Sequence, residues 1–278
     1  MNILECFSGT KSVGKCCDAL GWNSVSVDLL LPADHEVDIM EFDYKQYPKD
    51  HFDIIWASPP CTFYSNLQNC WIGRKRKDGT LVTKEWIEER KKESDKLIEK
   101  TLEIIQYFNP PLWFMENPAT GTLKKREVVK DIPFYDCSYC MYSDWGYEKK
   151  TRIWTNKKDW KPLICDKSGS CGNMIEAQHK SVLGNGYEMI NGKKTLCNTK
   201  KLRQKHKKDL GDNSWNCKGI AHKDKKNKHR LNVSKDIHTV GEKKGKHKTN
   251  VAVDFGGGTS RLDRYRIPEE LIFSLFLD

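Results

Sequence analysis

A doubly wound α/β fold is the fold class that this sequence predicts. Short apolar segments, such as residues 3–7 and 52–57, alternate with segments whose apolar residues recur at helical spacing. Gly and Pro separate the two kinds of segment, and strand–helix alternation is typical of a mostly parallel sheet. The 278 residues are enough for one substantial α/β domain and a smaller one.

The first elements follow from this alternation. Residues 3–7 form a buried strand, and Gly9 then turns the chain into a helix that Gly21 ends. The helix is expected to bury Val13, Cys16, Cys17 and Leu20, which are spaced i, i+3, i+4, i+7. Residues 24–27 form the second strand, which ends at Asp28, and residues 52–57 form the third.

A long helix, three further strands and a last helix complete the predicted α/β domain. Thr83 is placed to cap a helix that runs to Phe108, where Asn109-Pro110-Pro111 breaks it. Strands are expected at residues 112–115, 138–142 and 152–155. Pro268 with two acids opens a last helix, expected to bury Leu271, Ile272, Leu275 and Phe276.

Charge is concentrated in one part of the chain. Residues 156–250 carry 24 Lys and Arg against 9 Asp and Glu, a net +15, whereas the whole chain has +10. A near-neutral body with a basic insert is typical of enzymes that bind nucleic acid. We therefore expect a catalytic domain of residues 1–156 plus 251–278, and a small, irregular recognition insert of residues 157–250. Residues 223–248 have few large apolar side chains, so a solvated, partly disordered loop is an equal alternative there.

The compartment follows from cysteine usage and from the start of the chain. Eleven cysteines would suit disulfides, but the chain is long and Lys-rich, and its first residues enter a strand without a secretory signal. No apolar run reaches the roughly 20 residues of a membrane helix. We expect an intracellular monomer in cytoplasm, nucleoid or nucleus, with reduced thiols, that is neither secreted nor bound to a membrane.

Two signatures at predicted strand ends carry the chemistry. Pro59-Pro60-Cys61 follows one apolar strand and Glu116-Asn117-Pro118 ends another. Carboxyl ends of parallel strands converge on one crevice, so a thiol and a carboxylic acid would meet there. One unusual reaction needs such a pair. Carbon 6 of cytosine is a poor electrophile unless a thiolate adds to it while an acid relieves the charge at N3.

The chain resembles the DNA (cytosine-5)-methyltransferase family in six motifs that occur in the family's order. They are Phe7-Ser8-Gly9, Asp28, Asp38-Ile39, Pro59-Pro60-Cys61, Glu116-Asn117-Pro118 and Lys150-Thr151-Arg152. The resemblance covers residues 3–156 and, weakly, the last helix, and is strongest to compact viral and phage-type members. It implies a Rossmann-like, S-adenosyl-L-methionine-dependent methyltransferase domain.

The resemblance also implies roles for individual residues. Phe7 and Gly9 would pack on S-adenosyl-L-methionine, Asp28 would bind its ribose and Asp38 its adenine; Ser8, Ile39 and Pro59 complete the cofactor set. Cys61 would be the nucleophile that attacks carbon 6, Glu116 would act at N3, and Arg152 would hold the site and help to ionise the thiol. The segment 66–82, with Arg74-Lys75-Arg76-Lys77, would be a mobile loop that closes over the site.

Several features depart from the family's pattern. Lys11 stands where glycine is usual, Pro118 follows Glu116-Asn117 instead of valine, and Lys150 replaces the first arginine of its motif. The expected glutamine of that motif is missing, and Gly256-Gly257-Gly258 stands in place of a Gly-Asn signature. These departures affect substrate and efficiency more than chemistry, because Cys61 and Glu116 are intact.

Three alternatives remain for the function. A tRNA-directed branch shares the same Cys and Glu chemistry, although the size of the insert favours double-stranded DNA as partner. A catalytically inactive nucleic-acid-binding module is the second. An amino-methyltransferase is the third, which Cys61 disfavours because that class places an aromatic residue there.

Metal binding is not predicted. Cys137 and Cys140 form a CxxC, but residues 138–142 are expected to be a strand, in which residues three apart point to opposite faces. The other candidates have irregular spacing without a second CxxC; they are Cys165, Cys171, Cys197, Cys217, His179, His206 and His222.

Overall fold

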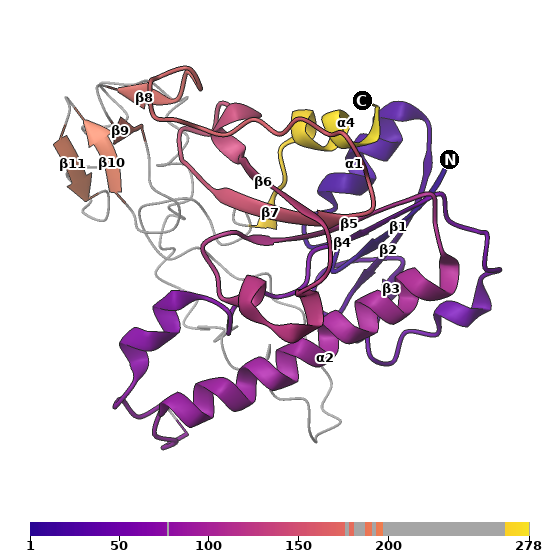
Figure 1. Cartoon of the computed structure of the whole chain (residues 1–278), viewed down its shortest axis with the longest axis horizontal. Coiled ribbons are helices and arrows are strands. Elements are labelled where there is room, and N and C mark those ends of the chain that lie inside the picture. Colours follow the sequence, from indigo (N-terminus) through magenta and orange to yellow (C-terminus); the bar gives the residue numbers. More distant parts are fainter. Residues whose placement is uncertain (77, 176–177, 181–186, 191–192, 197–264, 278) are drawn as a thin grey trace, which may run out of the picture. The chain divides into compact units, whose positions relative to one another are not determined.

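A seven-stranded, mostly parallel sheet forms the centre of the computed structural model (Figure 1). The structure describes residues 1–76, 78–175, 178–180, 187–190, 193–196 and 265–277. The strands are β1 (Asn2–Cys6), β2 (Asn23–Asp28), β3 (His35–Glu36), β4 (Ile54–Ala57), β5 (Leu112–Pro118), β6 (Phe134–Ser138) and β7 (Lys150–Thr155). Their order is β3-β2-β1-β4-β5-β7-β6, in which β7 runs antiparallel to both β5 and β6. The order reverses between β1 and β4, as in doubly wound sheets, so the predicted fold class is confirmed.

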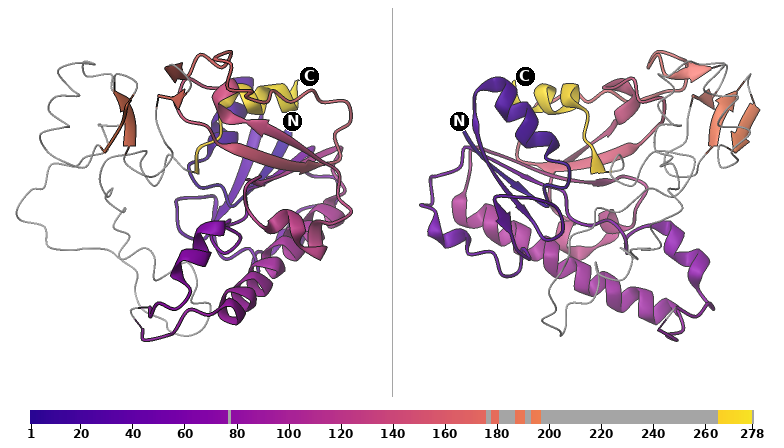
Figure 2. Two further views of the ribbon diagram at one scale, coloured as in Figure 1. Left: turned by 60° about the vertical axis from the view of Figure 1, so that its left-hand side comes forward. Right: turned by 180° about the vertical axis from the view of Figure 1, so that it is seen from behind.

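Alternating residues of the central strands supply the two faces of the sheet. One set packs with α2 (Lys84–Phe108) in the main core: Leu4, Cys6, Ile55, Ala57 and Met115 against Ile98, Ile105 and Phe108. On the other face, Trp56 and Phe114 contact Phe276 of α4 (Glu269–Phe276), with ring centroids 6.3 and 5.8 Å apart. The two faces are thus covered by different helices, as Figures 1 and 2 show.

The helix α2 begins and ends where the sequence predicts. The Thr83 side chain accepts a hydrogen bond from the Trp86 N–H, which caps the first turn. Asn109 adopts a left-handed conformation at the other end, and two prolines follow it. The helix buries Ile87, Ile98, Ile105 and Phe108, while Leu97 and Leu102 are partly buried.

The helices α1 (Ser12–Leu20) and α4 lie together on the opposite face (Figure 1). Gly21, in a left-handed conformation, ends α1, and its N–H bonds to the Asp18 carbonyl. The Ile267 N–H donates to the Ser12 hydroxyl at 3.2 Å, which ties the start of one helix to that of the other. The four α4 residues predicted to be buried are all buried.

The prediction of a strand at residues 138–142 is wrong. The strand β6 ends at Ser138, and Tyr139–Met141 form a 3₁₀ turn. Pairing with β7 stops at Ser138 and Lys150, and the chain then turns back within a few residues toward Lys149, whose carbonyl accepts from the Tyr139 N–H. Cys140 therefore lies on a turn and not on a strand.

The chain divides into two compact units, Met1–Lys180 with Tyr265–Asp278, and Ser181–Arg264. The first unit extends past the domain boundary expected at residue 156, because residues such as Trp160, Cys165 and Asn173 are buried in it. It ends in a two-residue hairpin of β8 (Met174–Ile175) and β9 (Gln178–His179).

Within the second unit, the structure describes β10 (Tyr187–Ile190) and β11 (Lys193–Leu196), an antiparallel pair. The predictions for residues 223–248, for Gly256-Gly257-Gly258, and for Cys197, His206, Cys217 and His222 lie outside the described residues. Among the helices that are described, none combines the length and hydropathy needed to cross a membrane.

Candidate active site

The turn after β1 carries three of the predicted cofactor residues. Phe7 and Gly9 have positive φ of 57° and 54°, and the Gly9 N–H donates to the Asp28 carboxylate at 2.9 Å. The other Asp28 oxygen accepts from the Leu30 and Leu31 N–H groups at 2.8 and 2.9 Å. Asp28 thus joins the turn after β1 to the loop after β2, and the predicted residues of both meet at one edge of the sheet.

Ser8 offers a buried hydroxyl at this turn. Its side chain is 5% exposed, and its Oγ has no hydrogen-bond partner among the described residues. Buried hydroxyls are normally paired. An orphaned donor between two left-handed residues is what a small polar ligand at this turn would satisfy.

Glu5, which sequence reasoning did not single out, fixes the start of α1. Its two carboxylate oxygens accept from the Val13 and Gly14 N–H groups at 3.2 and 2.9 Å. Burial raises the pKa of Glu5 to about 7, although the two backbone hydrogen bonds lower it. The available signal was an acid inside an otherwise apolar strand.

Asp38 and Ile39 follow β3 in a tight turn. The Asp38 carboxylate accepts from the Met40 N–H at 2.9 Å, and Asp38 is partly exposed. The Ile39 side chain is 4% exposed and belongs to the main core with Val27 and Phe42. Ile39 therefore positions this turn by packing.

The loops that carry Cys61 and Glu116 are joined by one buried hydrogen bond. The Asn117 amide donates to the Pro59 carbonyl at 2.9 Å, and Asn117 is 1% exposed. The Tyr64 N–H closes the turn by bonding to the Cys61 carbonyl at 3.1 Å. The Pro-Cys segment is therefore held directly against the end of β5.

Glu116 accepts three contacts on a single oxygen. The Tyr139 hydroxyl, the Thr151 hydroxyl and the Lys149 ammonium each lie 3.2 Å from its Oε1. Lys149 and Glu116 side chains are only 10% and 8% exposed, and the Lys149 ammonium lies 4.4 Å from the Tyr139 ring centroid. Glu116 is thus a buried carboxylate with a buried cation.

The charges of Lys149 and Glu116 both act on the thiol of Cys61. Burial raises the pKa of the Cys61 thiol, the Lys149 charge lowers it, and the Glu116 charge raises it. The expected source of positive charge was Arg152, but Lys149 is the cation that acts on the thiol.

Arg152 lies instead against Asp136 of the edge strand β6. Its guanidinium makes two bonds to that carboxylate, at 2.7 and 2.8 Å, and lies 3.6 Å from the Phe134 ring centroid. Thr151, the residue before it, contacts Glu116. Since side chains alternate along a strand, Arg152 points away from Glu116.

The segment 66–82, expected to form a loop over the site, has local secondary structure of its own. It contains a 3₁₀ helix, Asn66–Trp71, and a bridge between Lys75 and Leu81. The Arg76 guanidinium lies 4.9 Å from the Trp86 ring centroid, which connects the segment to the start of α2. The closing motion remains a prediction.

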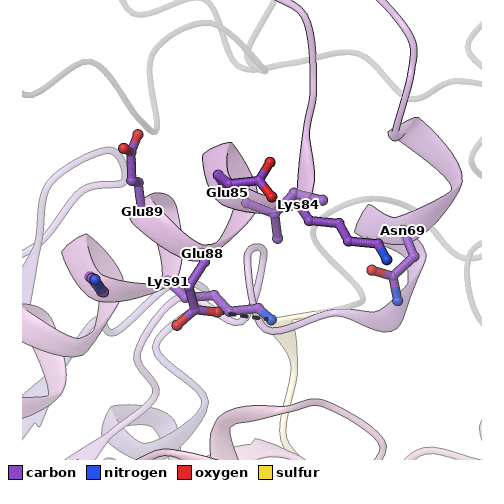
Figure 3. A pocket seen from close by; sticks show the side chains of 8 residues that line it. Asn69, Lys84, Glu85, Glu88, Glu89 and Lys91 are labelled. Carbon is purple, nitrogen blue, oxygen red and sulfur yellow. Dashed lines mark ion pairs between the residues drawn. The ribbon is translucent and has the colours of Figure 1, made fainter.

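A pocket of about 620 Å³ lies at this end of α2 (Figure 3). Mostly charged side chains of the helix line it, including Lys84, Glu85, Glu88 and Lys91, of which the last two form an ion pair at 3.6 Å. None of the predicted catalytic or cofactor residues lines it, so it is separate from the candidate site.

Comparison with known proteins identifies a viral relative. No family model matches the chain. A protein of Frog virus 3 (isolate Goorha), named a probable DNA (cytosine-5)-methyltransferase, is 42% identical over 176 residues, covering 63% of this chain and 79% of the relative.

Solved structures give a weaker likeness. The Entamoeba histolytica methyltransferase EhMeth has a TM-score of 0.40 at 16% identity, covering 59% of this chain and 55% of its own. The S. pombe Dnmt2 methyltransferase has a TM-score of 0.35 at 12% identity, covering 58% and 51%. The chain thus spans about half the length of these structures, and the family assignment rests on the viral relative. Because the viral relative is 42% identical and the match covers 79% of its length, the chain belongs to the DNA (cytosine-5)-methyltransferase family.

Proposed function

We propose that this protein transfers a methyl group from S-adenosyl-L-methionine to carbon 5 of cytosine in double-stranded DNA, with Cys61 as covalent nucleophile. The observation that carries the proposal is the Asn117–Pro59 hydrogen bond, because it joins the Cys61 loop to the strand end that holds Glu116. A nucleophile and an acid that act on one ring must be fixed relative to each other.

The turn after β1 fits the methyl donor. The orphaned Ser8 hydroxyl, the left-handed Phe7 and Gly9, and the half-buried Asp28 lie at one edge of the sheet. A side chain at Gly9 would be strained at φ +54° and would meet the Tyr265 Cβ at 3.4 Å. When bound there, S-adenosyl-L-methionine supplies an electrophilic methyl group.

The residues of the site have distinct tasks in the reaction. Cys61, as thiolate, forms a bond to carbon 6 of a cytosine that has been flipped out of the duplex. The electron pair displaced from the ring moves toward N3, where protonated Glu116 provides the proton. Carbon 5 then takes the methyl group, and loss of the carbon 5 proton with release of the Cys61 thiolate restores the ring. Tyr139, Thr151 and Lys149 all contact Oε1 of Glu116. We therefore assign the other oxygen, Oε2, to the contact with the flipped cytosine.

Lys149 takes the role expected of Arg152. Its charge opposes the effect of burial on the Cys61 thiol, so it favours the reactive thiolate. It also stabilises the carboxylate that Glu116 becomes once it has given its proton. Arg152, paired with Asp136, holds β6 to β7.

The nucleic-acid partner is inferred from charge. The net +15 of residues 156–250 suits phosphate contacts, so we assign target recognition to residues 157–250. RNA is the competing substrate, since it would use the same Cys61 and Glu116.

The decisive experiment traps the covalent adduct. Duplex DNA and folded tRNA, each carrying 5-fluorocytosine in place of cytosine, are incubated with the protein and the methyl donor. Fluorine cannot leave as a proton does, so DNA should form a stable adduct with the protein, and Cys61→Ser should form none. Trapping on tRNA alone would assign the substrate to RNA; trapping on neither, with normal cofactor binding, would leave an inactive binding module.

A further inference from the structure

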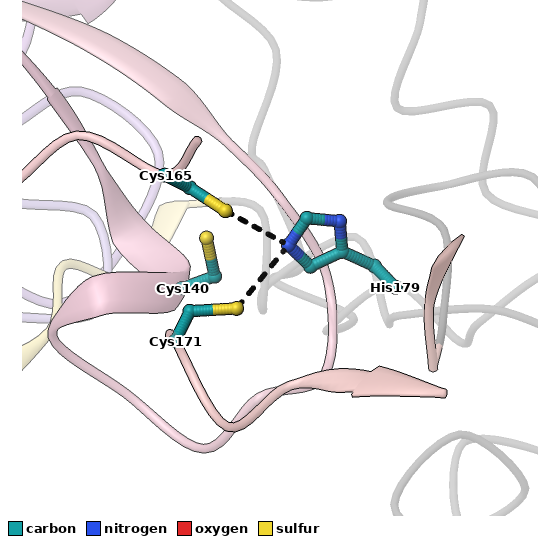
Figure 4. A group of neighbouring side chains, drawn as sticks. All are labelled: Cys140, Cys165, Cys171 and His179. Atoms are coloured by element: carbon teal, nitrogen blue, oxygen red, sulfur yellow. Dashed lines mark hydrogen bonds between the residues drawn. The ribbon is translucent and has the colours of Figure 1, made fainter. Parts of the chain in front are cut away.

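Three cysteines and one histidine gather beyond the active site (Figure 4). The Sγ atoms of Cys140, Cys165 and Cys171 and a ring nitrogen of His179 lie within 4.8 Å of one another. The sulfurs of Cys165 and Cys171 are each 3.7 Å from the His179 Nε2. From these side chains, we propose that the protein binds one structural zinc ion.

The spacing of the ligand atoms fits tetrahedral coordination. With Zn–S of about 2.3 Å and Zn–N of about 2.05 Å, a tetrahedral site separates sulfur from nitrogen by about 3.6 Å and sulfur from sulfur by about 3.8 Å. The two observed 3.7 Å separations match this spacing, and the remaining pairs of ligand atoms, all within 4.8 Å, would have to close by about 1 Å at most. Three thiolates and one imidazole are a common structural zinc set, and they fill all four positions.

The backbone around the cluster is organised by one buried amide. The Asn173 side chain, 2% exposed, donates to the carbonyls of Cys140 and Cys171 at 2.8 and 3.0 Å. Its oxygen accepts from the Gly146 N–H at 3.0 Å. Two ligand-bearing segments are thus tied together before any ion binds.

The other two ligands are held independently. The Cys165 N–H donates to the Ser138 hydroxyl at 3.1 Å, which anchors it to the end of β6. His179 is brought back by the β8–β9 pairing, in which it lies opposite Met174. Cys165 and His179 are therefore held by contacts other than those of the Asn173 amide.

This segment has little regular secondary structure. After β7 ends at Thr155, the only regular pairing among the described residues up to Lys180 is the two-residue β8–β9 hairpin. Buried cysteines elsewhere, such as Cys6 and Cys17, lie among apolar core residues and act as small hydrophobic side chains. Here the thiols face an imidazole, and a metal ion accounts for that combination.

The site has a consequence for catalysis, which rests on the proposed function. Cys140 is adjacent to Tyr139, and the Tyr139 hydroxyl contacts Glu116 at 3.2 Å. Zinc bound to Cys140 would fix the 3₁₀ turn Tyr139–Met141 and hence the orientation of that hydroxyl. The metal is therefore structural and acts on the active site through Tyr139.

The test measures metal directly. The full-length protein, purified without chelators, is analysed by elemental mass spectrometry, and the apoprotein is reloaded with cobalt. We expect one zinc per chain and a cobalt spectrum with tetrahedral ligand-field bands and thiolate charge transfer. In Cys171→Ser and His179→Gln, zinc affinity against a chromophoric chelator should fall at least about 100-fold. Cys70→Ser, at an exposed cysteine outside the cluster, should leave it unchanged.

Three outcomes would overturn the assignment: no zinc in the unaltered protein, cobalt bands without thiolate character, or zinc that both cluster variants retain at full affinity. A disulfide among the three cysteines, detected as two cluster cysteines of the denatured protein that resist alkylation until a reductant is added, would do the same. Because the readout is metal content and not methyl transfer, its failure is distinct from a failure of the proposed enzymatic function.

Discussion

Replacing Lys149 with Met is the change that tests the electrostatics of the proposed site most directly. Methionine keeps the length of the side chain but removes the ammonium that lies 3.2 Å from Glu116. At that distance, and at an effective dielectric constant of about 20, the attraction is about 5 kcal/mol. Removing one member of a buried pair typically costs about 3–5 kcal/mol, because the other charge loses its partner.

The kinetic effect has a defined direction. Lys149 lowers the pKa of the Cys61 thiol, so its loss raises that pKa further and reduces the thiolate at neutral pH. Methyl transfer by Lys149→Met, followed from about pH 6 to 9 in single turnovers, should be at least about 100-fold slower at neutral pH. Its rising limb should move to higher pH, and Lys149→Arg should recover most of the rate.

Two neighbouring cations provide matched controls. Lys150→Met removes a side chain that is 47% exposed, and Arg152→Met removes the cation that the sequence predicted for this role. Both should leave the position of the rising limb unchanged. If Lys149→Met keeps the limb in place while Arg152→Met shifts it, the assignment of the thiol's counter-charge to Lys149 is refuted.

Three further predictions follow from the site and the charge distribution. Glu5 has a folded-state pKa of about 7 against an ordinary 4.5, so its contribution to stability is complete below pH 4.5 and is lost as pH rises through 7. The unfolding free energy should therefore fall by about 3 kcal/mol between pH 4.5 and 7. Glu5→Gln should abolish this fall. Asn117→Ala, which removes the bond to Pro59, should lower kcat at least about 10-fold while the cofactor Kd stays unchanged, and an unaltered kcat would contradict the coupling of the two loops. Nucleic-acid affinity should fall steeply with salt, and deleting residues 223–248 should flatten that slope; a slope equal to that of the full chain would exclude these residues from phosphate contact.

The sequence was a good guide to the parallel part of the fold. Local signals located α2 between Thr83 and Asn109, and α1 up to Gly21, because capping and left-handed ends depend on a few neighbouring residues. Gly9 and Asp28, which follow two neighbouring parallel strands, lie together at one edge of the sheet, as the topology of such a sheet requires.

The grouping of the three cysteines and His179 was not predicted, because these residues come together only through long-range packing. Cys140, Cys165, Cys171 and His179 have no regular spacing, and assigning residues 138–142 to a strand placed Cys140 on the wrong kind of element. The turn at Tyr139 depends on where β7 stops pairing with β6, and no local sequence pattern marks that point.

The residues around Glu116 were missed for a different reason, which concerns strand direction. In a parallel sheet the functional edge collects residues that follow strands, and Cys61 and Glu116 were predicted to meet on that ground. The strand β7 runs antiparallel to β5, with Thr151 opposite Pro118 and Arg152 opposite Asn117. Its beginning, not its end, therefore lies at the functional edge, and Lys149 and Thr151 reach Glu116 from there. Where an antiparallel strand lies beside the last parallel one, its first residues reach the functional edge, and Lys149, which directly precedes β7, is such a residue.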